Sequence, residues 1–515
     1  MKYTGSKLRK TDNMKRCSGI ILPLYSLPSK YGIGALGKAA FDFADFLAAA
    51  GQGLWQMLPP GPTGYGDSPY QSLCDSAGNP YFIDLELLKE DGLLTDEELA
   101  ACDFGGEPRY VDYGKLFEGR MELLKKAKLR GWDKDAEEVT AFRLENASWL
   151  EDYALFMACK KHFDYLPWMQ WPDRELRLGK DGKTLKLWAA ELKADVELFI
   201  YVQFLFFKQW NNLRAYLRSL DISVAGDLPI YPALDSAEVW ANRRFFLMDE
   251  EGRPSAVSGV PPDDFTKDGQ LWGSPLYNWE TLKEDGYGFW IRRIGEAEKR
   301  FDYIRIDHFR GLYRYWAVPA GAESAAEGEW RFGPGMDFIG RMNDWFGSSR
   351  FLAEDLGAPD EGVGRLLKES GWPGMKVLEF AFKPGEDSPY LPHNHIENCL
   401  CCTGTHDNPP LAQWIEEADE KTKEKAVFYT GIRSEQDLAV SLIRAGMSSV
   451  AKIFIAQMQD YLGLGKAHRT NKPGTSEGNW RWRMLPGEAS PKLAKALKEI
   501  SELYGRSRSD SEQGV

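Results

Sequence analysis

The chain is poor in basic residues and has no long apolar run. Its 64 Lys and Arg are outnumbered by 77 Asp and Glu, which gives a formal net charge of −13. Such a surface repels a phosphate backbone, so nucleic acid is excluded as the expected partner. The early apolar stretch GIILPL is too short for a secretory signal and is broken by Pro23. We expect a cytoplasmic protein without membrane association, and a monomer or homodimer.

Cysteine and histidine are also scarce. The seven cysteines are odd in number and lack the dense spacing of a disulfide-stabilised secreted domain. Cys399, Cys401 and Cys402 form a cluster, but a zinc site needs a second such group, and the chain has none. We therefore expect reduced cysteines in a buried strand.

Apolar runs alternate with amphipathic segments along most of the chain. The first run, 19–24, is followed by a helical pattern over 36–51 and a second run over 53–59. Six further runs follow, at 221–231, 301–307, 349–355, 374–382, 398–407 and 448–460. Continuous apolar strands separated by helices indicate a parallel sheet covered on both faces. Eight of them predict an α/β fold, a closed (β/α)8 TIM barrel.

Two segments exceed what a minimal barrel needs. Helical patterns between the second and third runs predict a mainly helical insertion over 90–190. Residues 250–280 are rich in Gly, Pro and aromatic residues, which predicts a long loop, and such loops are usually functional lids. We expect the catalytic barrel to span 17–487, with a C-terminal helix over 488–505 and a disordered tail over 506–515.

Acidic residues gather at the ends of the predicted strands. Asp227 follows the third run, Asp307 the fourth, Glu354 and Asp355 the fifth, and Asp407 the seventh. In such barrels the carboxyl ends of the strands and the loops after them form the active site. Any one of these carboxylates can be purely structural, as the partner of an arginine. Together at one barrel mouth they indicate catalysis.

The stretch FDYIRIDHFRGL, 301–312, limits the kinds of reaction that these carboxylates can catalyse. Arg305 lies two residues before Asp307, on the same face of the strand, and a cation there argues against a divalent metal and a metal-dependent hydrolase. Glycosyl transfer instead needs one ionised and one protonated carboxyl group. Arg305 is expected to hold Asp307 ionised, whereas the apolar run before Glu354 is expected to raise the pKa of that carboxyl group.

Eleven short motifs resemble one known family. They are GPTGYGDSPYQS, AGNPYFIDL, GDLPIY, SGVPPD, GQLWGSPLY, RIDHFRG, LAEDLG, PGMKVLEFAF, LPHN, GTHDN and GNWRWR. From about residue 17 to about residue 487 the chain is similar to the 4-α-glucanotransferases, also called amylomaltases or disproportionating enzymes. The resemblance implies a (β/α)8 barrel that uses no metal or organic cofactor. It also implies transfer of α-1,4-glucan segments from a maltooligosaccharide to another glucan or to glucose.

The resemblance also assigns roles to residues. Asp307 is the nucleophile, Glu354 the general acid/base and Asp407 a third carboxylate that binds donor hydroxyls. Such a pair acts by retaining double displacement, with the two carboxyl groups about 5–5.5 Å apart. The residues implied to hold this group or to line the sugar subsites are Arg305, His406, Asp227, Tyr70, Ser68, Trp272 and Asn479.

The chain departs from the family pattern near these motifs. Asp264 stands where an aromatic residue is usual, and Pro409 and Pro410 follow the motif GTHDN. The lost aromatic face leaves the preferred acceptor open, and the prolines remove backbone donors after Asp407. An α-glucan hydrolase of the same barrel group is the alternative activity. A silent glucan-binding protein is a third, against which the three retained carboxylates argue.

Overall fold

A computed structural model describes residues 15–64, 66–179, 182–262, 267–385 and 387–507. Its central sheet has eight parallel strands in the order β10-β11-β12-β1-β2-β3-β6-β9. They are β1 (Cys17–Ile21), β2 (Leu54–Gln56), β3 (Ser223–Leu228), β6 (Tyr303–Ile306), β9 (Phe351–Ala353), β10 (Gly374–Val377), β11 (Cys399–Cys402) and β12 (Ile453–Gln457). Each of the eight predicted runs overlaps one strand, so the predicted barrel is confirmed.

The two edge strands meet and close the sheet. The Ala353 N–H donates to the Pro373 carbonyl at 2.8 Å, and the Met375 N–H donates to the Asp355 carboxylate at 2.7 Å. Side chains of β11 and β12 are buried along the whole length of each strand. This two-sided burial explains why the runs are continuous rather than alternating. The free thiols of Cys399, Cys401 and Cys402 lie in β11, as predicted.

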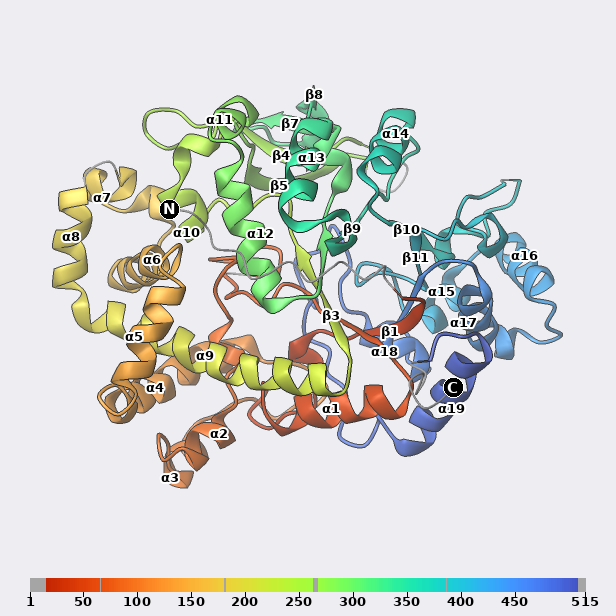
Figure 1. The fold of residues 1–515 in the computed structure, drawn as a ribbon, viewed down its shortest axis with the longest axis horizontal. Coiled ribbons are helices and arrows are strands. Elements are labelled where there is room, and N and C mark those ends of the chain that lie inside the picture. Colours follow the sequence, from red (N-terminus) through yellow and green to blue (C-terminus); the bar gives the residue numbers. More distant parts are fainter. Residues whose placement is uncertain (1–14, 65, 180–181, 263–266, 386, 508–515) are drawn as a thin grey trace.

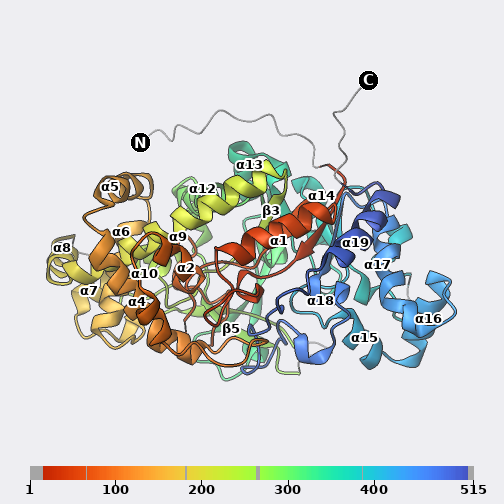
Figure 2. The same ribbon diagram turned by 90° about the horizontal axis from the view of Figure 1, so that it is seen from below.

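Helices cover the outside of the barrel. Seen from below, α1 lies between α9 and α19 (Figure 2). Buried positions of α12 include Phe289, Trp290, Ile294 and Ala297, the three-to-four residue spacing of one helix face. The helices that surround the barrel are α1 (Lys38–Ala49), α9 (Lys193–Ser219), α12 (Gly288–Arg300), α13 (Gly335–Phe346), α14 (Glu361–Ser370), α17 (Leu438–Ser448) and α19 (Pro491–Leu503).

A group of helices between β2 and β3 lies to one side of the barrel (Figure 1). It consists of α2 (Leu85–Glu90), α3 (Asp96–Ala100), α4 (Tyr113–Gly131), α5 (Ala136–Glu145), α6 (Leu150–His162), α7 (Arg174–Leu178) and α8 (Gly182–Glu191). The long helix α9 packs against α4, α5, α6 and α8 and so fastens the group to the barrel. Shorter helices elsewhere are α10 (Ala237–Ala241), α11 (Trp279–Glu284), α15 (Leu411–Glu417), α16 (Glu420–Thr430) and α18 (Met458–Tyr461). Across the described residues, no helix has both the length and the apolar character needed to cross a bilayer.

The described residues of 250–280 are not an irregular loop, contrary to expectation. They contain β4 (Ala256–Val260) and β5 (Gln270–Pro275). These strands join β7 (Arg314–Pro319) and β8 (Glu329–Phe332) in an antiparallel sheet ordered β5-β4-β7-β8, at the top of Figure 1. The Gly- and Pro-rich composition gave no sign of these strands. What stabilises β4 is its pairing with β7, a strand much later in the chain. Asp264 lies outside the described residues.

The C-terminal segment is ordered beyond its helix. Arg506 is fully buried. Its guanidinium group donates to the main-chain carbonyls of Cys17, Met447, Ser449, Ala451 and Lys452. The expectation that disorder begins at residue 506 is therefore wrong, because this side chain satisfies carbonyl groups at the base of the barrel. Residues 508–515 lie outside the described part of the chain.

Candidate active site

The strand register places the predicted site residues at one end of the barrel. Asp227 in β3 pairs with Arg305 in β6, and β6 pairs in turn with β9. Asp307 lies two residues beyond Arg305 and so projects from the same face. Asp307 follows β6 and Glu354 follows β9, so the two carboxyl groups leave neighbouring strands at their carboxyl ends. This is the end at which (β/α)8 enzymes carry their active sites.

Arg305 is the centre of a buried cluster of charges. Its Nη1 lies 2.7 and 2.6 Å from the two carboxylate oxygens of Asp227 and 3.1 Å from Asp307 Oδ1. The side chains of Arg305 and Asp227 are 5% and 0% exposed, whereas that of Asp307 is 27% exposed. Asp227 thus neutralises the arginine inside the barrel, and Asp307 faces the mouth.

Tyr70, His406 and Trp480 form an aromatic wall beside this cluster. Tyr70 Oη donates to Asp227 Oδ2 at 2.6 Å and lies 3.3 Å from His406 Nδ1. The Tyr70 and His406 rings stack with centroids 5.0 Å apart, and the Trp480 ring lies 6.0 and 5.8 Å from them. Burial raises the pKa of Tyr70 well above 10 and lowers the pKa of His406. Tyr70 therefore stays protonated and the imidazole stays neutral at pH 7.

Main-chain amides hold the carboxyl group of Glu354. The His308 N–H donates to Glu354 Oε2 at 2.8 Å, and the Leu356 N–H donates to Oε1 at 3.1 Å. The Phe309 N–H donates to the main-chain carbonyl of Glu354 at 2.9 Å. The turn after β6, which carries Asp307, therefore also fixes the position of Glu354.

Burial raises the pKa of both central carboxyl groups. For Glu354 burial is the largest cause, Arg305 opposes it, and the negative charge of Asp307 adds to it. For Asp307 burial again dominates, Arg305 opposes it, and Asp227 and Asp407 raise the pKa further. The expectation that Arg305 keeps the Asp307 pKa low is therefore wrong, because burial outweighs Arg305, whose charge is also shared with Asp227. A second negative charge in one partly buried site is unfavourable, so the pair retains one proton to a higher pH than ordinary carboxyl groups do. Because Arg305 donates directly to Asp307, that proton resides on Glu354.

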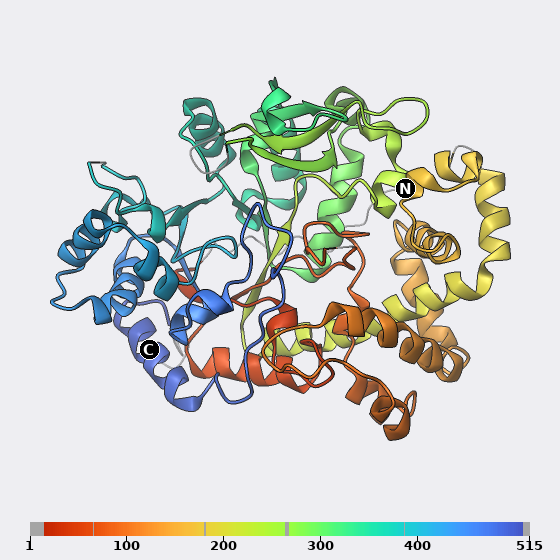
Figure 3. The same cartoon turned by 180° about the vertical axis from the view of Figure 1, so that it is seen from behind.

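Asp407 is held by a segment that crosses the barrel. Asn471 Nδ2 donates to Asp407 Oδ1 at 2.6 Å, and His406 Nε2 lies 3.2 Å from the same oxygen. The Arg469 guanidinium group donates to the Asp407 main-chain carbonyl. Asn471 and Arg469 belong to the segment after α18, which passes across the barrel in Figure 3. The Asp407 side chain is 45% exposed and so remains open to a ligand.

The other predicted subsite residues lie around this group. Trp272 of β5 packs edge-on against His308, with ring centroids 4.8 Å apart. Ser68 Oγ accepts the Tyr70 N–H at 3.3 Å. The Asn479 amide binds two main-chain groups of its own loop, at 2.9 Å each. Their sugar-binding roles remain predictions.

Sequence reasoning missed part of the site. Trp480 lies in the motif GNWRWR, so the resemblance offered a signal for it. Asn471 and Arg469 come from a polar loop without periodicity, and the chain offers no local signal for them. The contact from His308 is made by its main chain, which residue type does not reveal.

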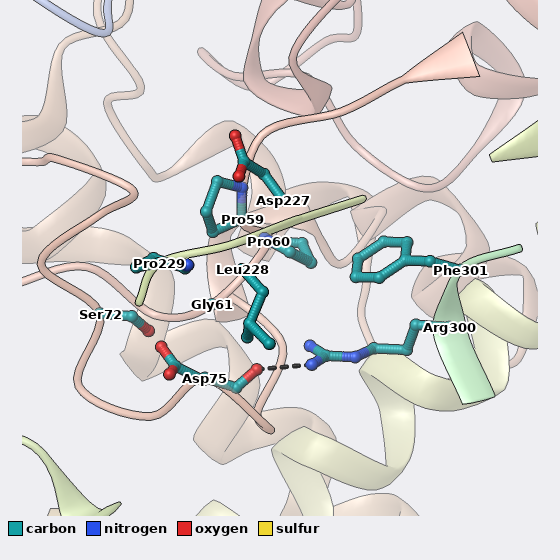
Figure 4. Close-up of a pocket in the computed structure, with 10 residues that line it drawn as sticks. All are labelled: Pro59, Pro60, Gly61, Ser72, Asp75, Asp227, Leu228, Pro229, Arg300 and Phe301. Atoms are coloured by element: carbon teal, nitrogen blue, oxygen red, sulfur yellow. Dashed lines mark hydrogen bonds between the residues drawn. The ribbon is translucent and has the colours of Figure 1, made fainter. Parts of the chain in front are cut away.

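A small pocket lies beneath Asp227 (Figure 4). It is lined by Pro59, Pro60, Gly61, Ser72, Asp75, Asp227, Leu228, Pro229, Arg300 and Phe301. Arg300 Nη2 donates to the Asp75 carbonyl at 2.6 Å, and Arg293 Nε donates to the Asp75 carboxylate at 2.9 Å. A second buried network thus supports the site from below.

A (β/α)8 barrel with two carboxyl groups at the ends of adjacent strands, one of them retaining a proton, is typical of enzymes that act on glycosidic bonds. Residues 22–488 match the family described as 4-alpha-glucanotransferase. The 4-alpha-glucanotransferase of Thermus thermophilus is 44% identical over 506 residues, which cover 96% of this chain and 99% of that protein. That of Streptococcus pneumoniae is 42% identical over 494 residues, or 96% and 98% of the two chains. The chain belongs to the 4-alpha-glucanotransferase family.

A solved structure agrees with these sequence matches. The amylomaltase from Streptococcus agalactiae, in complex with acarbose, superimposes with a TM-score of 0.93 at 37% identity. The match covers 96% of this chain and 100% of that one. The fold at the site is therefore that of an amylomaltase.

Proposed function

We propose that the chain transfers α-1,4-glucan segments from a donor maltooligosaccharide to the 4-hydroxyl group of an acceptor glucan or of glucose. Membership of the 4-alpha-glucanotransferase family supports this function, as does the likeness to an amylomaltase in complex with acarbose. The observation that carries it is the pair formed by Asp307, bound to Arg305, and Glu354, held by two main-chain amides.

The proposed reaction is a double displacement. Asp307 attacks the anomeric carbon of the donor while Glu354 gives its proton to the leaving glycosidic oxygen, and a glycosyl ester forms on Asp307. Glu354, now ionised, takes the proton of the acceptor 4-hydroxyl, and that oxygen attacks the anomeric carbon and releases Asp307. Two inversions give net retention of the anomeric configuration.

Asp407 is proposed to bind hydroxyl groups of the donor sugar. Its exposed oxygen can accept hydrogen bonds, while Asn471 and His406 fix the other one. A neutral His406 leaves the negative charge of Asp407 available to the positive charge that develops at the transition state. Tyr70 and Trp480 offer aromatic faces to a sugar ring.

Transfer rather than hydrolysis requires that a bound acceptor outcompete water. Residues 250–280 are proposed to act as the cover, because β5 brings Trp272 to the turn that carries Asp307 and His308. The buried thiols of β11 support a reducing compartment, so we also propose that the enzyme works in the cytoplasm.

Product analysis on maltotriose tests the proposed function. A transferase converts maltotriose into glucose and longer maltodextrins with little change in total reducing ends, because each bond broken is replaced by another. A hydrolase raises the reducing ends steadily, and that result would refute transfer. Asp307→Asn serves as the control, since it keeps the shape of the side chain and removes the nucleophile. Substantial turnover by this variant would refute the assignment of Asp307.

A further inference from the structure

The main chain of His308 adopts an unusual conformation. Its φ of 50° and ψ of 52° lie in the left-handed region, which non-glycine residues seldom occupy, although Asn, Asp and His do so more often than the others. This conformation directs the His308 N–H at Glu354 Oε2, 2.8 Å away. Because left-handed backbone is intrinsically unfavourable for most side chains, the surrounding structure must hold the turn in place.

One ring contact of His308 and one small neighbour hold the turn. Trp272 packs edge-on against the ring, at an interplanar angle of 85°. Gly311 leaves space on another side, since a Cβ at that position would stand 3.2 Å from His308 Cδ2 and 2.9 Å from Ile230 Cδ1. The ring carries no charge at neutral pH, because burial and the nearby Arg310 lower the pKa of His308 to about 4. A neutral, packed ring fits a structural role.

We infer that His308 is a positioning residue for Glu354: its ring, packed against Trp272, maintains the left-handed turn that aims the His308 N–H at the Glu354 carboxyl group. The inference rests on the proposed role of Glu354 as acid/base. Trp272 of β5, in the small sheet, then has two roles: it lines the site, and through His308 it helps to position the acid/base Glu354.

A series of substitutions at His308 distinguishes the effect of the main-chain conformation from the effect of the imidazole ring. His308→Gly and His308→Asn favour the left-handed conformation, His308→Ala tolerates it poorly, and the β-branched His308→Val tolerates it least. We expect kcat for maltotriose disproportionation to fall in that order. His308→Gly and His308→Asn should stay within about tenfold of the wild type, and His308→Val should lose about ten- to a hundredfold relative to them, as for one hydrogen bond to a charged group.

The pH profile provides a readout that a merely structural role would not move. Glu354 must be protonated to act as an acid, so activity falls as pH rises through its pKa. An N–H donor to the carboxylate lowers that pKa, and its loss raises it. The alkaline limb of kcat should therefore move to higher pH in His308→Ala and His308→Val and stay in place in His308→Asn.

Further measurements distinguish the positioning role of His308 from the alternatives. A glycosyl fluoride donor needs no protonation of its leaving group, so the first step of its reaction should remain fast in a folded His308→Val. If His308→Val does not fold, the same comparison is made with His308→Ala. The inference is overturned if the series is flat, or if His308→Gly and His308→Asn lose as much as His308→Val, which would mean that the imidazole itself acts. Glu354→Gln is measured alongside. If it retained wild-type turnover, the proposed acid/base and this inference would fall together, whereas an inactive Glu354→Gln with a flat series would overturn only the positioning role.

Discussion

Replacing Asp227 by asparagine removes one of the two carboxylates that share Arg305. Asp227 and Asp307 approach the same Nη1 at 2.6 and 3.1 Å, and Asp227 raises the pKa of Asp307. Two charges about 5 Å apart interact by about 3 kcal/mol at an effective dielectric constant of about 20. That energy corresponds to about two pKa units. We therefore expect the pKa of Asp307 to fall by about one to two units in Asp227→Asn.

The assay is kcat/KM for maltotriose as a function of pH. Asp307 must be ionised to act as a nucleophile, so activity appears as pH rises through its pKa. A lower pKa moves this acid limb to lower pH. Because breaking a buried ion pair costs about 3–5 kcal/mol of stability, the profiles are measured well below the melting temperature of the variant.

Asp302→Asn is the matched control. Asp302 pairs with Arg214 at 2.7 Å just before β6, at the opposite end of the strand from Asp307. The variant makes the same change of charge and breaks an ion pair, so it should lose stability without moving the acid limb. An unchanged acid limb in Asp227→Asn, or one moved to higher pH, would refute the shared-arginine explanation.

Two further predictions follow from other parts of the structure. Glu354→Gln should lower kcat/KM on maltotriose by about 10²–10⁴-fold while a glycosyl fluoride still reacts with Asp307, as measured by fluoride release, and an equal loss on both donors would contradict the acid role. A chain that ends at Gly505 lacks the buried Arg506 and its hydrogen bonds to main-chain carbonyls. It should therefore have a lower melting temperature than a chain that ends at Ser507. Equal melting temperatures would contradict a stabilising role of Arg506.

The barrel was predictable because its signal is local. Two-sided burial makes a strand such as β12 apolar along its length, and eight such runs separated by helices leave few other folds. The small sheet was not predictable, because β4 is stabilised by pairing with β7, much later in the chain, and β5 by pairing with β4, rather than by their own composition. Arg506 looked like part of a polar tail, because only the fold brings it to the main-chain carbonyls that it binds.

The site was predictable as far as strand ends determine it. Asp307 and Glu354 follow buried strands, so their meeting at the barrel mouth required only the fold. The pKa of Asp307 was not predictable, since it depends first on burial and then on how Arg305 divides its hydrogen bonds between Asp227 and Asp307. The role of the His308 main chain was also hidden, because His308 reaches a left-handed φ without being a glycine, the residue type that signals one.

The most direct test of the proposed chemistry is to trap the covalent intermediate. Glu354→Gln is incubated with an α-maltosyl fluoride, which can form the ester without an acid, while the missing base slows its release. Mass spectrometry of the quenched and digested protein should find a maltosyl group on the peptide that contains Asp307. A label on a different residue, or an unlabelled protein that releases a product of inverted configuration, would contradict a retaining mechanism through Asp307.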